Sequence, residues 1–344
     1  MDFARRTAAN VTMPVPVASA RAGQTRGLLL ALGATTAWSS AGLFVRLVET
    51  GTSWHIIFYR SLGLTVALAA MIAVIHRGQA GRAIRSAGWT AALAGACSCA
   101  SSALFILALG QVTVANALFM TGIAPFLAAL GGRIVLGERV GRHTWGGMAL
   151  AAGGVALMLG QGLALGRLAG NLLALGSATS FAVYGVLVRG NRQTDMLPAV
   201  LYSGVYGSFL GLSVLLATGG PAAPLDRIGL PLRDVGLSFA MGVTQLALGM
   251  ALYTRASRHL PAAELQLLAT IELVLAPLWV WIGVGEVPTR TTLAGGALIF
   301  LAVLAQALVA RRHGQASGEP VGDRRPARRS PESPRAGRAP GVDA

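Results

Sequence analysis

A single carboxylate, Glu272, lies in the middle of an apolar run, residues 262–283, that is long enough to cross a membrane. A charged side chain near the centre of a bilayer costs on the order of 3 kcal/mol even on lenient insertion scales, so such residues usually serve a function. Glu272 could bind a cationic group of a ligand, or take up and release a proton, and either role needs a desolvated site. The alternative is a protonated structural carboxyl that bonds to a neighbouring helix.

The residues around Glu272 are small on one helix face. By spacings of three and four, that face carries Leu265, Ala269, Glu272, Ala276 and Trp279. The two alanines leave room for a ligand beside the carboxylate, and the indole of Trp279 could stack on it. Tight packing of the same face on another helix is the alternative.

Two prolines, Pro125 and Pro277, lie inside apolar runs. A proline removes the helical hydrogen bond to the carbonyl four residues earlier, here that of Thr121 or Leu273. In lipid, that carbonyl must find another donor or face a wet cavity. The sequence is compatible with a substrate-facing break, helped by Gly122 beside Thr121, and with an ordinary kink.

Further polar and aromatic side chains lie within the apolar runs and extend the candidate binding site to Trp38, Tyr184, Asn116, Gln245 and Gln266. Trp38 and Tyr184 occupy similar places in the first span of each half, so they could form opposite walls of a cavity. For each residue taken singly, packing or hydrogen bonding between helices is the favoured interpretation.

The other charged residues near span ends are interpreted as structural. Snorkelling of the guanidinium to the interface is favoured for Arg46 and Arg60, and Arg46 is expected to pair with Glu49 on the surface. Binding of a substrate carboxylate by these arginines is the less favoured alternative. Glu138 and Glu286 each follow a span and would lie near the start of the next helix, where a carboxylate suits the helix dipole.

The composition places most of the chain in lipid. Of its 344 residues, 54% are hydrophobic and 12% charged, and the mean hydropathy is +0.62. Soluble domains carry about 25% charged residues. Every basic residue is an arginine, which excludes a P-loop ATPase and a Schiff-base cofactor, since both need a lysine. We expect neither a cofactor nor a metal site, and we assign packing roles to Cys97 and Cys99.

The pattern of apolar runs predicts an all-α polytopic membrane protein with ten transmembrane helices. The expected spans are 27–48, 54–75, 88–110, 113–136, 143–161, 168–189, 197–217, 234–256, 262–283 and 291–310. Residues 1–26 and the Arg- and Pro-rich residues 311–344 are expected to be disordered tails. Most arginines lie in the tails and in the loops on the same side, so both termini are expected in the cytoplasm. The tail charge suits anionic lipid rather than nucleic acid.

The chain contains an internal repeat. The segment Leu29–Gly33 recurs as Leu172–Gly176, and the pair Gly137-Glu138 recurs as Gly285-Glu286. Each half, 27–161 and 168–310, therefore holds five spans. Because five is odd, the second copy is inverted relative to the first, which is an architecture typical of carriers that work by alternating access.

These features resemble the drug/metabolite transporter superfamily, EamA type. The strongest segment is "ANALFMTGIAPFLAALGGRIVLGERVGRHTWGGMALAAGGVAL", residues 115–157, and the second copy contains Glu272 and Glu286 in "LQLLATIELVLAPLWVWIGVGE". Trp38 and Arg46 in the first span also match. The resemblance implies a carrier of small metabolites in the bacterial inner membrane, with a cavity between the halves and peripheral fifth and tenth spans that can serve as homodimer contacts.

The sequence thus predicts a secondary-active transporter, most often an exporter, of a small metabolite such as an amino acid or amine, driven by protons or by exchange. A multidrug or cation efflux carrier is the alternative, and a passive channel or a polytopic membrane enzyme is less favoured. No hydrolase or metalloprotease motif is present, and the five histidines fall at span ends, in loops or in the tail.

Overall fold

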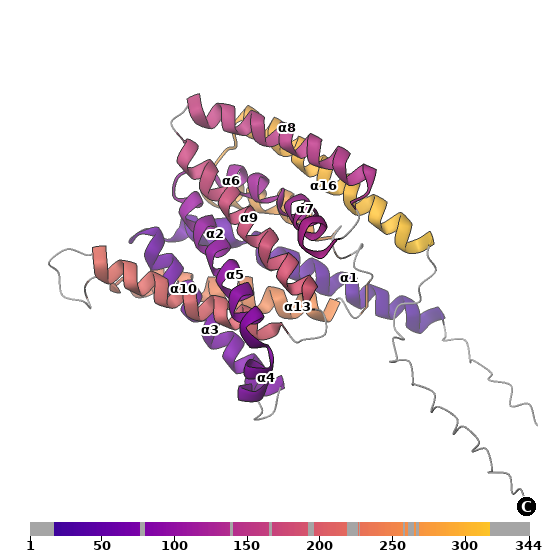
Figure 1. Cartoon of the computed structure of the whole chain (residues 1–344). Coiled ribbons are helices and arrows are strands. Elements are labelled where there is room, and N and C mark those ends of the chain that lie inside the picture. The colour runs from indigo at the N-terminus through magenta and orange to yellow at the C-terminus, as the bar shows by residue number, and fades with distance from the viewer. Residues whose placement is uncertain are drawn as a thin grey trace, which may run out of the picture.

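A computed structural model describes most of the chain between the two tails. The described residues are 17–75, 80–137, 140–164, 167–191, 196–218, 226, 228–256, 259–260, 265 and 268–316. All regular elements within these ranges are helices (Figure 1). Expectations that concern Glu138, Gln266 and residues 1–16 and 317–344 of the two tails lie outside the described residues. Residues 17–26 and 311–316, which were expected to be disordered, are helical.

The helices form a bundle whose elements are described in chain order. In the first half they are α1 (Val17–Ser39), α2 (Ala41–Leu47), α3 (Ser53–Ile75), α4 (Ala80–Ser86), α5 (Gly88–Leu109), α6 (Val114–Thr121), α7 (Ala124–Leu136) and α8 (Arg142–Ala164). In the second half they are α9 (Leu168–Gly190), α10 (Leu197–Thr218), α12 (Leu232–Met241), the π-helix η1 (Gly242–Leu248), α13 (Gly249–Ala256), α15 (Glu272–Val284) and α16 (Arg290–Ala316).

Eight helices within the described residues are long and apolar enough to cross a membrane. They are 25–47, 53–75, 88–109, 114–136, 168–190, 197–218, 232–256 and 290–309, and they lie at the places of expected spans one to four, six to eight and ten. The fifth expected span coincides with α8. The ninth coincides in part with the shorter α15, and much of its first half lies outside the described residues.

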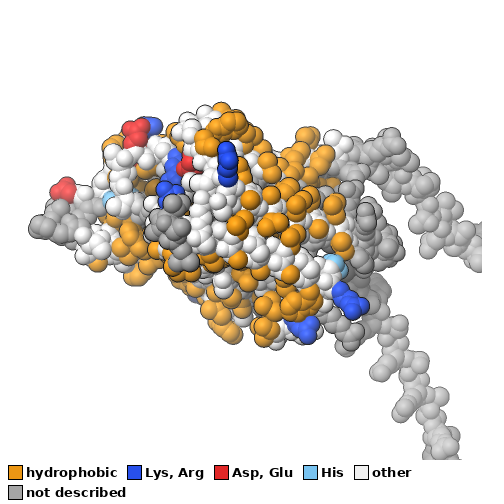
Figure 2. All heavy atoms as spheres, turned by 90° about the horizontal axis from the view of Figure 1, so that it is seen from above, with side chains coloured by type: hydrophobic (Ala, Val, Ile, Leu, Met, Phe, Trp, Pro, Cys, Tyr) orange, Lys and Arg blue, Asp and Glu red, His pale blue; other side chains and the backbone are white. Residues whose placement is uncertain are grey.

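Hydrophobic side chains cover much of the outside of the bundle. Figure 2 shows them over most of the face seen from above, with few charged groups among them. The exposed large side chains include Trp89, Ile134, Phe209, Ile282 and Leu301. A soluble protein does not expose apolar surface on this scale, so the pattern is that of a multi-pass membrane protein in contact with lipid chains.

Two spans are interrupted at matching positions. In the first half α6 ends at Thr121 and α7 begins at Ala124, and in the second half α15 begins at Glu272, which is 148 residues after Ala124. Both α7 and α15 have 13 residues, and each ends at a glycine with left-handed backbone, Gly137 (φ 67°) or Gly285 (φ 71°). Only glycine adopts this conformation at little cost.

The first interruption is a helix end followed by a new helix start, so of the two alternatives that the sequence left open it is a break rather than a proline kink. Pro125 lies in the first turn of α7, where its missing N–H costs nothing, rather than inside a continuous helix. The helix is interrupted at Gly122 and Ile123, and the Gly122 N–H donates to the Leu118 carbonyl of the preceding helix (2.9 Å). Pro277, in contrast, does lie inside α15.

The short helix α6 lies at the centre of the largest core cluster. Every residue from Val114 to Met120 is buried, which is the pattern of a helix enclosed on all sides. It contacts α9, α15 and α16, while α8 and α16 run side by side along one edge of the bundle (Figure 1). The core therefore forms around one of the two interrupted spans.

Glycines bring α3 against the span that contains η1. A side chain at Gly63 would overlap the Phe239 carbonyl, and one at Gly242 would overlap the Arg60 carbonyl. The two backbones are therefore in direct contact. This approach places Arg60 of α3 beside the π-helix.

We predict that Gly242→Ala destabilises the protein by about 2 kcal/mol or more, because the added methyl group would push against backbone rather than against a flexible side chain. Gly236→Ala is the matched control on the same span, since nothing lies within 4 Å of a methyl group at that position. The control should be neutral or up to about 1 kcal/mol stabilising, as alanine is the better helix former. Thermal unfolding midpoints in detergent measure both, and equal midpoints would contradict the close contact.

Candidate functional site

Glu272 is the first residue of α15 and follows the interruption of the ninth expected span. From Glu272 to Val284 the helix rises about 18 Å at 1.5 Å per residue, which places the carboxylate near the middle of a hydrocarbon core of about 30 Å. Its side chain is half-buried, and among the described residues no hydrogen bond or ion pair contacts it. The N-terminus of α15 favours a negative charge there, while the oxygens stay available to a cation or a proton.

α1 supports the interruption from one side. The Thr35 hydroxyl donates to the Leu268 carbonyl (3.3 Å), which precedes the turn that leads into Glu272. The indole N–H of Trp279, two turns further along α15, donates to the Ser39 hydroxyl (2.9 Å). α1 therefore holds α15 both at its start and beyond the small residue Ala276. Thr35 and Ser39 were missed by the sequence analysis, although polar residues on one face of a first span are a signal for such contacts.

Trp38 belongs to the same stretch of α1 but faces another helix. Its ring lies 5.1 Å from the ring of Tyr253 on α13, and a side chain at Gly249 would overlap its indole. The Trp38 carbonyl accepts a hydrogen bond from the Gln245 amide (3.5 Å). Trp38 thus packs on the span that contains η1, while its neighbour Ser39 contacts Trp279.

Arg60 is the main departure from the sequence-based interpretation. The predicted snorkelling to the membrane interface is wrong, because only 4% of the residue is exposed. Its Nη1 donates to the Ser102 hydroxyl and its Nη2 to the Gln245 side-chain oxygen (3.1 Å). Arg60 lies about 10 Å along α3 from Ser53, and the glycine-mediated contact with η1 closes over it.

The guanidinium of Arg60 has no acidic partner among the described residues, and its Nε has no hydrogen-bond acceptor there. A charged arginine within a span costs about 3 kcal/mol on insertion scales, and an unpaired buried N–H adds about 1–3 kcal/mol. Gln245, predicted to line the site, supplies only a neutral oxygen. Burial of Arg60 has no sequence signal, since it depends on the tertiary approach of α3 and η1.

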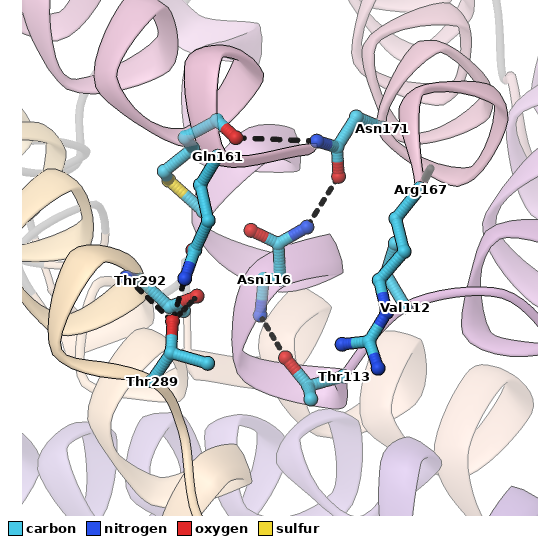
Figure 3. Close-up of a pocket in the computed structure, with 9 residues that line it drawn as sticks. Val112, Thr113, Asn116, Gln161, Arg167, Asn171, Thr289 and Thr292 are labelled. Atoms are coloured by element: carbon cyan, nitrogen blue, oxygen red, sulfur yellow. Dashed lines mark hydrogen bonds between the residues drawn. The ribbon is translucent and has the colours of Figure 1, made fainter. Parts of the chain in front are cut away.

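Asn116 makes a hydrogen bond between helices. Its amide donates to the side-chain oxygen of Asn171 on α9, whose own amide donates to the Met158 carbonyl (3.3 Å). Figure 3 shows both amides in a polar pocket that Gln161 and Thr289 also line. The pocket has a volume of about 20 Å³, which holds about one water molecule.

Tyr184 and Thr121 make contacts that do not involve Glu272. Tyr184 packs with Leu187, Met196 and Tyr202 against a small-residue cluster of α5 and α10, whereas Trp38 packs on α13. The two rings therefore pack on different helices, and their role as opposite walls of one cavity stays a prediction. The Thr121 hydroxyl donates to the Leu118 carbonyl of its own helix (2.9 Å).

Arg46 lies in a network at the end of the bundle where α2, α5 and α15 terminate, which we call the Arg46 end. Its Nε donates to one oxygen of Glu286 (2.7 Å), and its two Nη atoms donate to the carbonyls of Leu109 and Val112 (both 2.9 Å). The other Glu286 oxygen accepts from the Val114 N–H at the start of α6 (2.7 Å). One ion pair thus joins four chain segments.

Two sequence-based expectations are corrected by this network. Arg46 does not pair with Glu49, which instead contacts Arg233 on the exposed surface (2.6 Å). Glu286 does serve a helix N-terminus, but that of α6 rather than that of the next helix along the chain. The sequence did carry a signal for the pair, because Arg46 and Glu286 are rare charges at the ends of spans that terminate on the same side of the membrane.

A model of the "EamA-like transporter family" matches residues 25–160 and again residues 168–306. The pseudopaline exporter CntI of Pseudomonas aeruginosa (strain UCBPP-PA14) is 27% identical over 298 residues, covering 81% of this chain and 95% of that protein. The protein RarD of Salmonella typhimurium is 27% identical over 289 residues, covering 82% and 95%. One solved structure shares the fold with a TM-score of 0.58 at 18% identity, covering 84% of this chain and 99% of its own.

We predict that Glu286→Gln lowers the free energy of unfolding by about 2 kcal/mol, because it removes the charge that pairs with the partly buried Arg46 and caps α6. Glu49→Gln is the matched control, as both members of its ion pair are more than half exposed and such pairs contribute little. Thermal midpoints of the purified proteins compare the two. Equal loss in both variants would show that the Arg46 end is not held by this carboxylate.

Proposed function

Because the chain belongs to the EamA-like transporter family, we propose that it is a secondary-active carrier that exports a small metabolite by alternating access. The proposed substrate class is an amino acid or amine, moved by exchange or with a proton. One relative, the pseudopaline exporter CntI, is an exporter, which supports the direction of transport. The proposed location is the bacterial inner membrane.

The observation that carries this proposal is the carboxylate of Glu272 at the start of an interrupted transmembrane span. Interrupted helices place backbone groups and helix ends near the bilayer midplane, which is where carriers bind substrates and coupling ions. The two interruptions fall at matching positions of the two halves, which supports inverted repeats of residues 27–161 and 168–310. Glu272 would then lie close to the interface of the halves.

Glu272 suits either of two roles in such a carrier. A carboxylate without a protein partner can pair with a substrate ammonium group, with the indole of Trp279, two turns along the same helix, available for apolar or cation–π contacts. The same carboxylate can exchange a proton with water when the cavity opens. Both roles use the half-buried position of the side chain.

The network at the Arg46 end supports a role in closing the transport path on that side. It ties the ends of α2, α5 and α15 to the start of α6 through one ion pair and three backbone contacts. Under the proposed topology, with both termini in the cytoplasm, this is the periplasmic side. Transport then requires the Arg46–Glu286 pair to open once per cycle.

We predict that Glu272→Gln abolishes net transport while the protein still inserts and folds. Uptake into proteoliposomes with an imposed pH gradient measures net transport, and counterflow at equal pH measures exchange. If Glu272 binds the substrate amine, both are lost; if it carries only the proton, counterflow persists. Glu49→Gln, on the exposed surface, should behave as wild type. Normal gradient-driven uptake by Glu272→Gln at every pH would disprove the central role of this residue.

The proposed topology predicts that a green fluorescent protein fused after residue 344 is fluorescent, while alkaline phosphatase fused there is inactive. Arginine is concentrated in the tails and in the loops on their side, which retains them in the cytoplasm. Fusions truncated after Gly110 provide the reverse control, since that loop is expected in the periplasm. Phosphatase activity at the C-terminus would reverse the assignment of both sides.

A further inference from the structure

Arg60 combines three properties that are rare together in a membrane span. It is 96% buried, it has no acidic partner among the described residues, and its Nε–H points to no acceptor there. Its two contacts, Ser102 and Gln245, are neutral. A buried cation with an unfilled donor can bind an anion whose oxygen atoms lie in the plane of the guanidinium.

Arg46 provides a comparison, because its guanidinium has the hydrogen bonds expected of a structural arginine. Arg46 uses its Nε and both Nη atoms, and one of its acceptors is the carboxylate of Glu286. Arg46 is partly exposed, so water can also reach it. Arg60 is more deeply buried and yet less well satisfied, which is the reverse of what a purely structural role requires.

A π-helix provides one of the contacts of Arg60. Gln245 lies in the π-helix η1, and π-helical turns within longer helices occur frequently at functional sites. Arg60, Ser102 and Gln245 come from three different spans. A change in the angle between any two of these spans would therefore rearrange the contacts of the guanidinium.

The cluster is connected to the Glu272 region through α1. The Gln245 amide reaches the Trp38 carbonyl (3.5 Å), and the next residue, Ser39, accepts from Trp279 of α15 (2.9 Å). Measured along their helices, Arg60 lies about 10 Å and Glu272 about 18 Å from the Arg46 end. The guanidinium of Arg60 and the carboxylate of Glu272 thus lie at different depths, and α1 contacts the surroundings of both.

From this arrangement we propose that Arg60, with Ser102 and Gln245, forms a subsite for a carboxylate group of the transported compound. The proposal rests on the carrier function proposed above and narrows its substrate class to compounds with both a carboxylate and an amine. The Nε–H and one Nη–H of Arg60 bind the two carboxylate oxygens, since the planar fork matches their spacing. The Ser102 hydroxyl provides a further donor, and the amine is bound by Glu272.

The first test needs only the wild-type chain in proteoliposomes. Counterflow is measured for amino acids paired with their decarboxylated amines: arginine with agmatine, lysine with cadaverine, histidine with histamine, and phenylalanine with phenethylamine. The methyl ester of each amino acid keeps the amine and removes the carboxylate charge. We expect counterflow of at least one amino acid and little or none of its amine and ester.

The second test compares Arg60→Gln, Arg60→Lys and, as control, Arg133→Gln. Arg133 is exposed and contacts the ring of Trp145, so its loss removes the same charge from a place outside the subsite. For the transported amino acid, Arg60→Gln should raise the half-saturating concentration by about tenfold to a hundredfold, because it removes one member of a buried charge pair. Arg60→Lys, which keeps the charge but loses the fork, should fall between wild type and Arg60→Gln. The control should match wild type.

The outcomes separate this inference from the function on which it rests. Equal counterflow of an amino acid and its amine, or an equal effect of Arg60→Gln on both, overturns the carboxylate subsite and leaves the carrier function standing. If folded wild-type protein carries no member of any pair, the proposed function fails for these classes and the subsite fails with it. If Arg60→Gln does not fold, the subsite is still tested by Arg60→Lys and by the wild-type counterflow of each amino acid against its amine and ester.

Discussion

The dominant constraint on this chain is that a polar group inside the bilayer must find its partner within the protein. Many hydroxyl groups obey it by donating to a carbonyl one turn earlier in their own helix, and other polar groups obey it through contacts between distant parts of the chain. Asn116 bonds to Asn171, and the carbonyl of Leu268, near the interruption that precedes α15, accepts from Thr35. Even at the partly exposed Arg46 end, each of the three guanidinium nitrogens of Arg46 donates a hydrogen bond. Against this background, a group that lacks a partner is informative.

Besides the buried oxygens of Ser238 and Gln306, which also lack a partner among the described residues, two charged groups depart from that rule, and their charges are opposite. Glu272 has no partner among the described residues, and Arg60 has neutral partners and one unfilled donor. Both are held by close packing that does not depend on their charge: α1 holds α15, and the glycine contact holds α3 against η1. The surrounding packing can therefore sustain the cost of two incompletely satisfied ionisable groups. A ligand that carries the complementary charges would lower that cost in the bound state.

The sequence predicted the membrane spans, which the bilayer requires, and missed the pairings that arise from tertiary contacts. Hydropathy located the spans, because a helix must be long and apolar to cross the bilayer. It left open whether the fourth span is interrupted beside Gly122 or only kinked at Pro125, because the position of Pro125 in the first turn of a helix is decided by the fold. The pair of Arg46 with Glu286 and the burial of Arg60 join residues from opposite halves of the chain. Such pairs follow no local period, so a single sequence carries little signal for them.

The two halves of the chain share a scaffold but differ at the residues that carry charge. The interrupted spans begin their second helices at positions 148 residues apart, with equal lengths and the same left-handed glycine at the end. Yet Ala124 occupies the position in the first half that corresponds to Glu272 in the second half. A strictly symmetric site would present the same group twice and would suit a symmetric ligand. Because the charge is present in one half only, the repeat in the proposed carrier would provide the means of movement, and Glu272 and Arg60 would fix the orientation in which an asymmetric compound binds.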